Sequence, residues 1–176
     1  LLQFHAYADS ARTPVEEHLT EAALYASSQG EADVHFTVSS EHRELFEELL
    51  ERVVPEYEQE YKVTYHVSLS EQLPSTDTVA ANEDGTPFRT AEGELLFRPG
   101  GHGALIRNLD ALDTDVVFIK NIDNVVPDSL KADTVLWKQV LAGVLVSVQE
   151  QTFRYLHLLE SGNYSHADLE EMIRFV

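Results

Sequence analysis

The chain has no cysteine, and only four of its 176 residues are lysine. The lack of cysteine excludes disulfide bonds, thiolate catalysis and zinc sites with sulfur ligands. No apolar run is long enough to span a bilayer, and the longest, 140–148, is interrupted by Gly143 and Ser147. We therefore expect no membrane partner. Because the first residues do not resemble a signal peptide, we expect a cytoplasmic location.

Positive charge is scarce throughout the sequence. Only 12 lysine and arginine residues stand against 31 aspartate and glutamate residues, which gives a formal net charge of −19. A surface of this charge repels nucleic acids, so we expect no nucleic-acid partner. Two explanations of the acidity stay open. The carboxylates lie on ordinary solvated helix faces, or the protein works in concentrated salt, where the Debye length falls to about 3 Å at 1 M.

The first half of the chain alternates between helix and strand patterns. Thr13-Pro14-Val15-Glu16 combines an N-cap, a proline and a capping box, and it predicts the start of a helix. Residues 34–38 have the pattern of a strand, and a second helix follows that we expect to stop at Pro55. Residues 62–68 form the next predicted strand. Such alternation is typical of a largely parallel α/β sheet.

The second half is irregular at first and then helical. Residues 70–97 indicate short antiparallel strands joined by glycine-containing turns. Residues 133–160 have sustained helical spacing of apolar residues, and Ser165 is expected to cap a last helix. We divide the chain into an α/β region, 1–127, and a helical extension, 128–176, that is expected to pack on the same domain. The apolar spacing of the long helix also leaves open a homo-dimer formed through it.

Residues 98–124 carry the strongest functional signal. A glycine-rich turn at 99–103 precedes a predicted helix, 104–112, and a predicted buried strand, 115–120, and a polar cluster with Asp123 follows. In an open parallel sheet, ligands bind at the carboxyl ends of the strands. We therefore predict half of a nucleotide and metal site, in which the glycine loop and Asp123 face one crevice.

The loop and the acid are predicted to bind different parts of the ligand. A backbone without Cβ atoms, followed by a helix N-terminus, suits a phosphate or base, and the predicted nucleotide-binding residues are Gly100, Gly101, His102 and Gly103. The alternative is a tight loop in which glycine only relieves crowding. Asp123 is predicted to bind Mg²⁺, which prefers oxygen ligands and shares them with phosphates. The alternative is an Asx turn that ends the strand.

Three further side chains are candidates. Lys120, at the end of the predicted strand, and Arg12, before the first helix, are predicted catalytic residues that contact phosphate. The alternative for both is a surface charge. Gln72 is predicted to bind a base edge, because its amide both donates and accepts hydrogen bonds. The sequence has no Walker-type loop, no GxGxxG fingerprint and no serine nucleophile elbow.

These segments resemble UDP-sugar pyrophosphorylases, especially the UDP-N-acetylglucosamine pyrophosphorylase type, from about Phe4 to Asn124. More closely, the chain is similar to an uncharacterised bacterial family of longer proteins that carries a domain-of-unknown-function label. Residues 99–105 resemble the family's Pro-x-Gly-x-Gly-Gly loop, which approaches uridine. Residues 121–124 resemble its Val-Asp-Asn motif, whose aspartate lies at the metal and phosphate site. Gln72 falls near the position of a uracil-contacting glutamine.

The resemblance implies a fold and a reaction. The fold is a three-layer α/β structure with a mixed, mainly parallel sheet of the nucleotide-diphospho-sugar transferase (Rossmann-like) type, with a helical C-terminal part. The reaction joins a nucleoside triphosphate, expected to be UTP, to a sugar 1-phosphate and releases pyrophosphate, with Mg²⁺ as cofactor. The family's N-terminal strand, triphosphate loop and later lysine have no counterpart here, so we expect a fragment of a longer protein that is inactive alone. The alternative is a non-catalytic domain that binds a nucleotide or sugar nucleotide, or serves as a scaffold.

Overall fold

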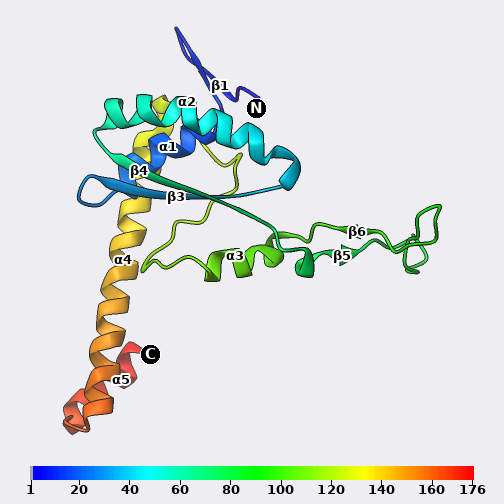
Figure 1. The fold of residues 1–176 in the computed structure, drawn as a ribbon. Helices are drawn as coiled ribbons and strands as arrows, with labels where there is room; N and C mark the ends of the chain where they lie inside the picture. The colour runs from blue at the N-terminus through cyan, green and yellow to red at the C-terminus, as the bar shows by residue number, and fades with distance from the viewer. Residues whose placement is uncertain (1) are drawn as a thin grey trace. The chain divides into compact units, whose positions relative to one another are not determined.

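The computed structural model describes residues 2–176, which form two compact units (Figure 1). The first unit ends at Pro127, and the second begins at Asp128. The first unit contains helices and strands and holds every residue of the predicted site, whereas the second unit is helical. The packing of the helical extension on the α/β region stays a prediction.

Helix α1, Pro14–Tyr25, begins where the sequence predicts. The Thr13 side chain accepts a hydrogen bond from the Glu16 backbone amide, and the Glu16 carboxylate accepts one from the Thr13 amide at 2.7 Å. The predicted capping box is therefore confirmed. Val15 and Leu19 are fully buried, so one face of the helix is directed into the core.

Strands β3, Glu31–Val38, and β4, Thr64–Glu71, form a parallel pair that helix α2, Arg43–Tyr61, connects. All eight residues of each strand pair in register. Helices α1 and α2 lie on the same side of this pair (Figure 1). The core of the unit lies between the helices and the strands, and its buried residues are Val15, Leu19, Ala22, Ala32, Phe36, Val38, Leu49, Leu50, Val53, Tyr57 and Tyr65.

The prediction that Pro55 ends the second helix is wrong. Helix α2 continues through Pro55, and Lys62 ends it with a left-handed φ of 56°. Proline removes one helical hydrogen bond and crowds the preceding turn, which costs about 3 kcal/mol. Val53 and Tyr57, on either side of Pro55, are buried in the core. Burial of each such side chain stabilises the fold by roughly 1.5–3 kcal/mol, so the two together offset the local loss.

The prediction of a strand at 115–120 is also wrong. The segment pairs with no strand of the described part of the chain. It contacts α1 instead, because the Phe118 ring packs on the Tyr25 ring at 5.0 Å between centroids and Lys120 forms an ion pair with Glu21. Contacts with a helix face have taken the place of the strand pairing that the apolar run favours.

The remaining strands are short and antiparallel. They form two separate pairs: β1, His5–Ala6, with β2, Ala11–Arg12, and β5, Thr78–Val79, with β6, Phe97–Arg98. The insert between β5 and β6 turns at Gly85 and Gly93, both with positive φ as the predicted turns require. Residues 2–176 thus form a mixed α/β fold with small sheets, one of them parallel. The three-layer, Rossmann-like sheet is not confirmed, since no third parallel strand from the described residues joins β3 and β4.

The second unit consists of two helices. Helix α4, Asp128–Ser161, is continuous, and helix α5, His166–Phe175, begins with the predicted capping box at Ser165. The Tyr155 hydroxyl of α4 donates a hydrogen bond to the Glu171 carboxylate of α5 at 2.6 Å, which joins the two helices. Among residues 2–176, no helix combines the length and the apolar character that crossing a bilayer requires.

Candidate functional site

The face of β3 and β4 that points away from the core is polar. His35 of β3 lies between two hydroxyls of β4: its Nδ1 is 2.7 Å from Ser68 Oγ, and its Nε2 is 2.8 Å from Ser70 Oγ. The Thr37 hydroxyl lies 3.3 Å from the same Ser70 oxygen. Burial lowers the pKa of His35, which favours the neutral imidazole. One ring nitrogen then donates a hydrogen bond and the other accepts one.

Helix α3, Ile106–Asp110, is attached to this face by Asn108. The Asn108 Nδ2 group donates to the Ser70 hydroxyl and to the Glu71 backbone carbonyl, both at 2.8 Å. Asn108 is the buried residue of α3, with 8% of its surface exposed. Because α3 directly follows the glycine loop, this amide ties the loop to the carboxyl end of β4.

The glycine loop meets the segment after β4 at Gly100. A Cβ atom on Gly100 would lie 2.8 Å from the Thr76 backbone oxygen, 2.8 Å from the Ala104 Cβ and 3.6 Å from the Gln72 Nε2. The first two distances are too short for any side chain, so this position requires glycine. The structure therefore brings together two of the predicted nucleotide-binding residues, Gly100 and Gln72. The Gln72 Nε2 also donates to the Asp77 carboxylate at 3.3 Å.

The other loop residues lie in open surroundings. Gly101 is extended, with φ of −72°, and precedes a 3-10 helix, η3, that spans His102–Leu105. A Cβ atom on Gly101 or Gly103 would meet nothing within 4 Å, and His102 is exposed. Of the three loop glycines, only Gly100 is therefore required by crowding within the chain. The space beside Gly101 and Gly103 is open to a ligand.

The two predicted catalytic cations are engaged with buried carboxylates of α1. Arg12 Nη1 lies 3.7 Å from an oxygen of Glu17, whose side chain is fully buried, and its guanidinium stacks over the Tyr7 ring. Lys120 forms its ion pair with Glu21, which is 1% exposed. A buried carboxylate is stable only when it is paired and hydrogen-bonded. Both cations thus have a structural role, and their contact with phosphate stays a prediction.

Asp123 lies in an exposed turn beside α1. The turn is closed by a backbone hydrogen bond of 3.0 Å from the Asn124 amide to the Asn121 carbonyl. His18 of α1 also holds this turn, because His18 Nε2 donates to the Ile122 carbonyl at 3.0 Å. Burial lowers the pKa of His18 and so favours the neutral imidazole that makes this bond.

The predicted metal site consists of Asp123 alone. In the described chain, 2–176, no three histidine or acidic side chains gather as ligands for an ion. Mg²⁺ often binds through one or two carboxylates together with substrate phosphates, so a single exposed carboxylate fits an ion that arrives with a nucleotide. No hydrogen bond or ion pair within residues 2–176 joins the Asp123 turn to the glycine loop, and each is held by a different support.

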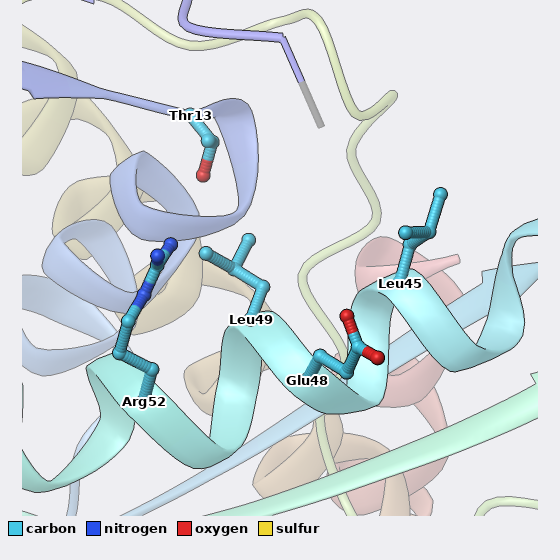
Figure 2. Close-up of a pocket in the computed structure, with 5 residues that line it drawn as sticks. All are labelled: Thr13, Leu45, Glu48, Leu49 and Arg52. Carbon is cyan, nitrogen blue, oxygen red and sulfur yellow. The ribbon is translucent and has the colours of Figure 1, made fainter.

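A pocket of about 210 Å³ lies elsewhere, between the start of α1 and α2 (Figure 2). Its lining residues are Thr13, Leu45, Glu48, Leu49 and Arg52. None of the predicted site residues lines it, and the Thr13 side chain is already occupied by the capping box. The pocket carries no argument for nucleotide binding.

Sequence reasoning missed the polar network of His35, Ser70 and Asn108. A signal for its strand members was present, because polar residues alternate with apolar ones along both strands. In a strand this period of two places the polar side chains on one face. Asn108 had no such signal, because its partners are 37 and 38 residues away in the chain.

Comparison with known proteins gives a family and no closer relative. No curated protein and no solved structure matches the chain. One family matches, and the match extends over residues 1–176. It supports the predicted similarity to an uncharacterised family and does not extend to UDP-sugar pyrophosphorylases. The chain belongs to the family described as "Domain of unknown function (DUF4301)".

Proposed function

We propose that this chain is the nucleotide-binding part of a nucleotidyltransferase that joins UTP to a sugar 1-phosphate and releases pyrophosphate. The observation that carries the proposal is the proximity of Gly100 and Gln72: a Cβ atom on Gly100 would lie 3.6 Å from the Gln72 Nε2. The two residues are 28 positions apart in the chain, and the resemblance assigns both to the same uridine. A glycine that admits no side chain lies beside an amide that both donates and accepts. This pairing suits a flat, polar ligand such as a nucleobase.

The base and the ribose would lie over the glycine loop. Gly101 and Gly103 leave open space, and the backbone there can approach a ligand without a Cβ atom between them. The Gln72 Nε2 donates to Asp77, which orients the amide and leaves its carbonyl oxygen able to accept from a base N–H. Gln72 would then select for a base with a donor on its edge.

Asp123 would hold Mg²⁺ jointly with the phosphate oxygens of the nucleotide. When bound, the ion would neutralise phosphate charge during in-line attack by the sugar phosphate. The chain contributes positioning, since no covalent intermediate with the protein is required. His18 supports this role indirectly, because its bond to the Ile122 carbonyl fixes the turn that presents Asp123.

The phosphate contacts need cations that the fold can release. Moving Arg12 or Lys120 to a phosphate would leave Glu17 or Glu21 buried without its charge partner, which is costly. Arg98 and Arg107 flank the glycine loop and are exposed. We therefore include these two arginines with the predicted pair as candidates for binding phosphate.

A second candidate function is a non-catalytic domain that binds a sugar nucleotide. The engagement of Arg12 and Lys120 with buried carboxylates favours it, because a binding module needs no mobile catalytic cation. The two candidates differ in their need for metal. Catalysis requires Mg²⁺ at Asp123, whereas recognition of the base and the sugar does not.

Calorimetric titration with UTP and with UDP-N-acetylglucosamine, each with and without Mg²⁺, tests the proposal. We expect Mg²⁺-dependent binding of UTP that Gln72→Ala weakens, because the substitution removes the base contact. Gly143→Ala, in the middle of α4, is the matched control for a substitution outside the site. Metal-independent binding of the sugar nucleotide alone would support the second candidate. If the protein binds neither nucleotide at millimolar concentration, both candidate functions are rejected.

A further inference from the structure

We infer that Asn108 is a positioning residue that sets the distance between the glycine loop and Gln72. The inference rests on the proposed function for its ligand, although the anchoring itself is a property of the fold. It assigns a role to a residue that contacts neither the base nor the phosphates in the proposed site.

Two chain segments run side by side through three successive contacts. The first is the β5–β6 pairing of Thr78 with Arg98. The second is the close approach of Gly100 to the Thr76 carbonyl. The third is the double hydrogen bond of Asn108 to the Ser70 and Glu71 positions. Gln72 lies between the second and third contacts, so its place relative to the loop depends on both.

Two hydrogen bonds of the Asn108 side chain hold the third contact. Helix α3 has five residues, which is too short to be stable by its own hydrogen bonds. Ile106, the first residue of α3, is 66% exposed. Asn108 is the residue of α3 that is buried, and both of its Nδ2 hydrogens are directed to β4. The position of α3, and of the loop before it, therefore depends on this amide.

The chemistry of the contact requires an amide donor. The Glu71 backbone oxygen can only accept, so the group opposite it must donate. A carboxylate at position 108 would face this carbonyl with no hydrogen to give. The Asn108 Oδ1 atom is itself buried, and it has no hydrogen-bond partner among residues 2–176. Both bonds are therefore made by the Nδ2 group alone. Asn108→Asp removes the bond to the Glu71 carbonyl with almost no change of volume.

The second partner of Asn108 extends the anchor into β3. Ser70 Oγ contacts His35 Nε2 at 2.8 Å and Thr37 Oγ1 at 3.3 Å. With a neutral His35, Ser70 can donate to the imidazole while it accepts from Asn108. The loop helix is thus connected to both strands of the parallel pair, whose other face lies on the core. A rigid support of this kind is what precise ligand positioning needs.

The test compares Asn108→Asp with the wild type and with the control Asn82→Asp. Asn82 is exposed and its Nδ2 donates within the hairpin that turns at Gly85. Hydrogen exchange of the amides at 101–105 reports the anchoring without any ligand. Binding of uridine and of magnesium pyrophosphate, measured separately, reports positioning, because uridine needs the loop and Gln72 whereas pyrophosphate needs the Asp123 side.

We expect Asn108→Asp to accelerate exchange at 101–105 and to weaken uridine binding about tenfold or more, while pyrophosphate binding changes little. Asn82→Asp should change none of these three measurements.

Unchanged hydrogen exchange at 101–105 would overturn the anchoring by Asn108. Equal weakening of uridine binding and pyrophosphate binding would overturn the positioning role and leave Asn108 as a purely structural residue. A wild type that binds no uridine would reject the proposed function, while the exchange rates would still decide the anchoring. If Asn108→Asp does not fold, Ser70→Ala removes one of the two bonds and must show the same pattern in weaker form.

Discussion

Lys120 forms an ion pair with Glu21 across 99 positions of the chain, and the Glu21 side chain is fully buried while that of Lys120 is 9% exposed. The Tyr25 hydroxyl donates to the same carboxylate at 2.9 Å. This pair holds the extended segment that contains Lys120 against α1. Lys120, which is predicted to contact phosphate, therefore also neutralises a buried carboxylate of the protein.

We expect Lys120→Met to destabilise the fold by about 3–5 kcal/mol, because it leaves the Glu21 carboxylate buried without its cation. Urea unfolding followed by circular dichroism measures the change. The double variant Lys120→Met with Glu21→Gln should recover most of the loss, since neither charge then remains. A single variant as stable as the wild type would contradict the buried pair.

Gly100→Ala should destabilise the protein by about 1–3 kcal/mol, because the added methyl group meets the Thr76 carbonyl and Ala104 at 2.8 Å. Gly101→Ala is the matched control. The φ of Gly101 suits alanine, and the added Cβ atom would meet nothing within 4 Å. We therefore expect Gly101→Ala to raise the free energy of unfolding by about 0.4–1 kcal/mol, because alanine lowers the conformational entropy of the unfolded chain. Thermal unfolding of the two variants compares them directly, and equal effects would contradict the close approach at Gly100.

Stability should decrease as the pH falls below about 6.5. Burial lowers the pKa of His18 and of His35 in the folded state, so the unfolded chain binds protons more readily than the native protein does. Their contribution is therefore complete above the unfolded pKa and is lost as the pH falls toward the lowered one. Urea midpoints between pH 7.5 and pH 5 measure the loss.

Substitution separates these two histidines from the others. His18→Gln and His35→Gln should each flatten the pH dependence of the urea midpoint, whereas His102→Gln, at an exposed position, should leave it unchanged. Identical slopes for all three variants would show that neither of these two partly buried imidazoles causes the pH dependence.

The melting temperature should rise with molar sodium chloride if the acidity is an adaptation to concentrated salt. A net charge of −19 destabilises the compact state by self-repulsion, and salt screens this repulsion. Calorimetric scans from low salt to molar salt make the measurement. A flat response would favour the other explanation, in which the carboxylates lie on well-solvated helix faces.

Self-association through α4 stays a prediction, and the second unit offers a specific test. Trp137, Leu141 and Val144 follow helical spacing and are each more than half exposed. No charged residue lies between Lys138 and Glu150, so two copies could meet there without adding like charges. Light scattering should find a dimer that Leu141→Glu dissociates. If the protein is a monomer at all concentrations, self-association through α4 is rejected.

Several features of the structure follow from short stretches of sequence. The capping boxes at Thr13 and Ser165, and the glycine turns at positions 85 and 93, form as predicted because each depends on residues within about four positions of one another. The parallel pair of β3 and β4 also agrees with the alternation of apolar residues. In these places local chemistry and the tertiary structure favour the same conformation.

The sequence by itself determined the caps, the turns, the polar alternation of the two parallel strands and the strong acidity, since these depend on neighbouring residues or on composition. Only the tertiary structure decided that α2 continues through Pro55, that residues 115–120 follow a helix without joining a sheet, and that Asn108 bonds to β4. The physical reason is the same in each case. Burial and hydrogen bonds between distant segments outweigh local preferences of a few kcal/mol, and their partners are not neighbours in the sequence.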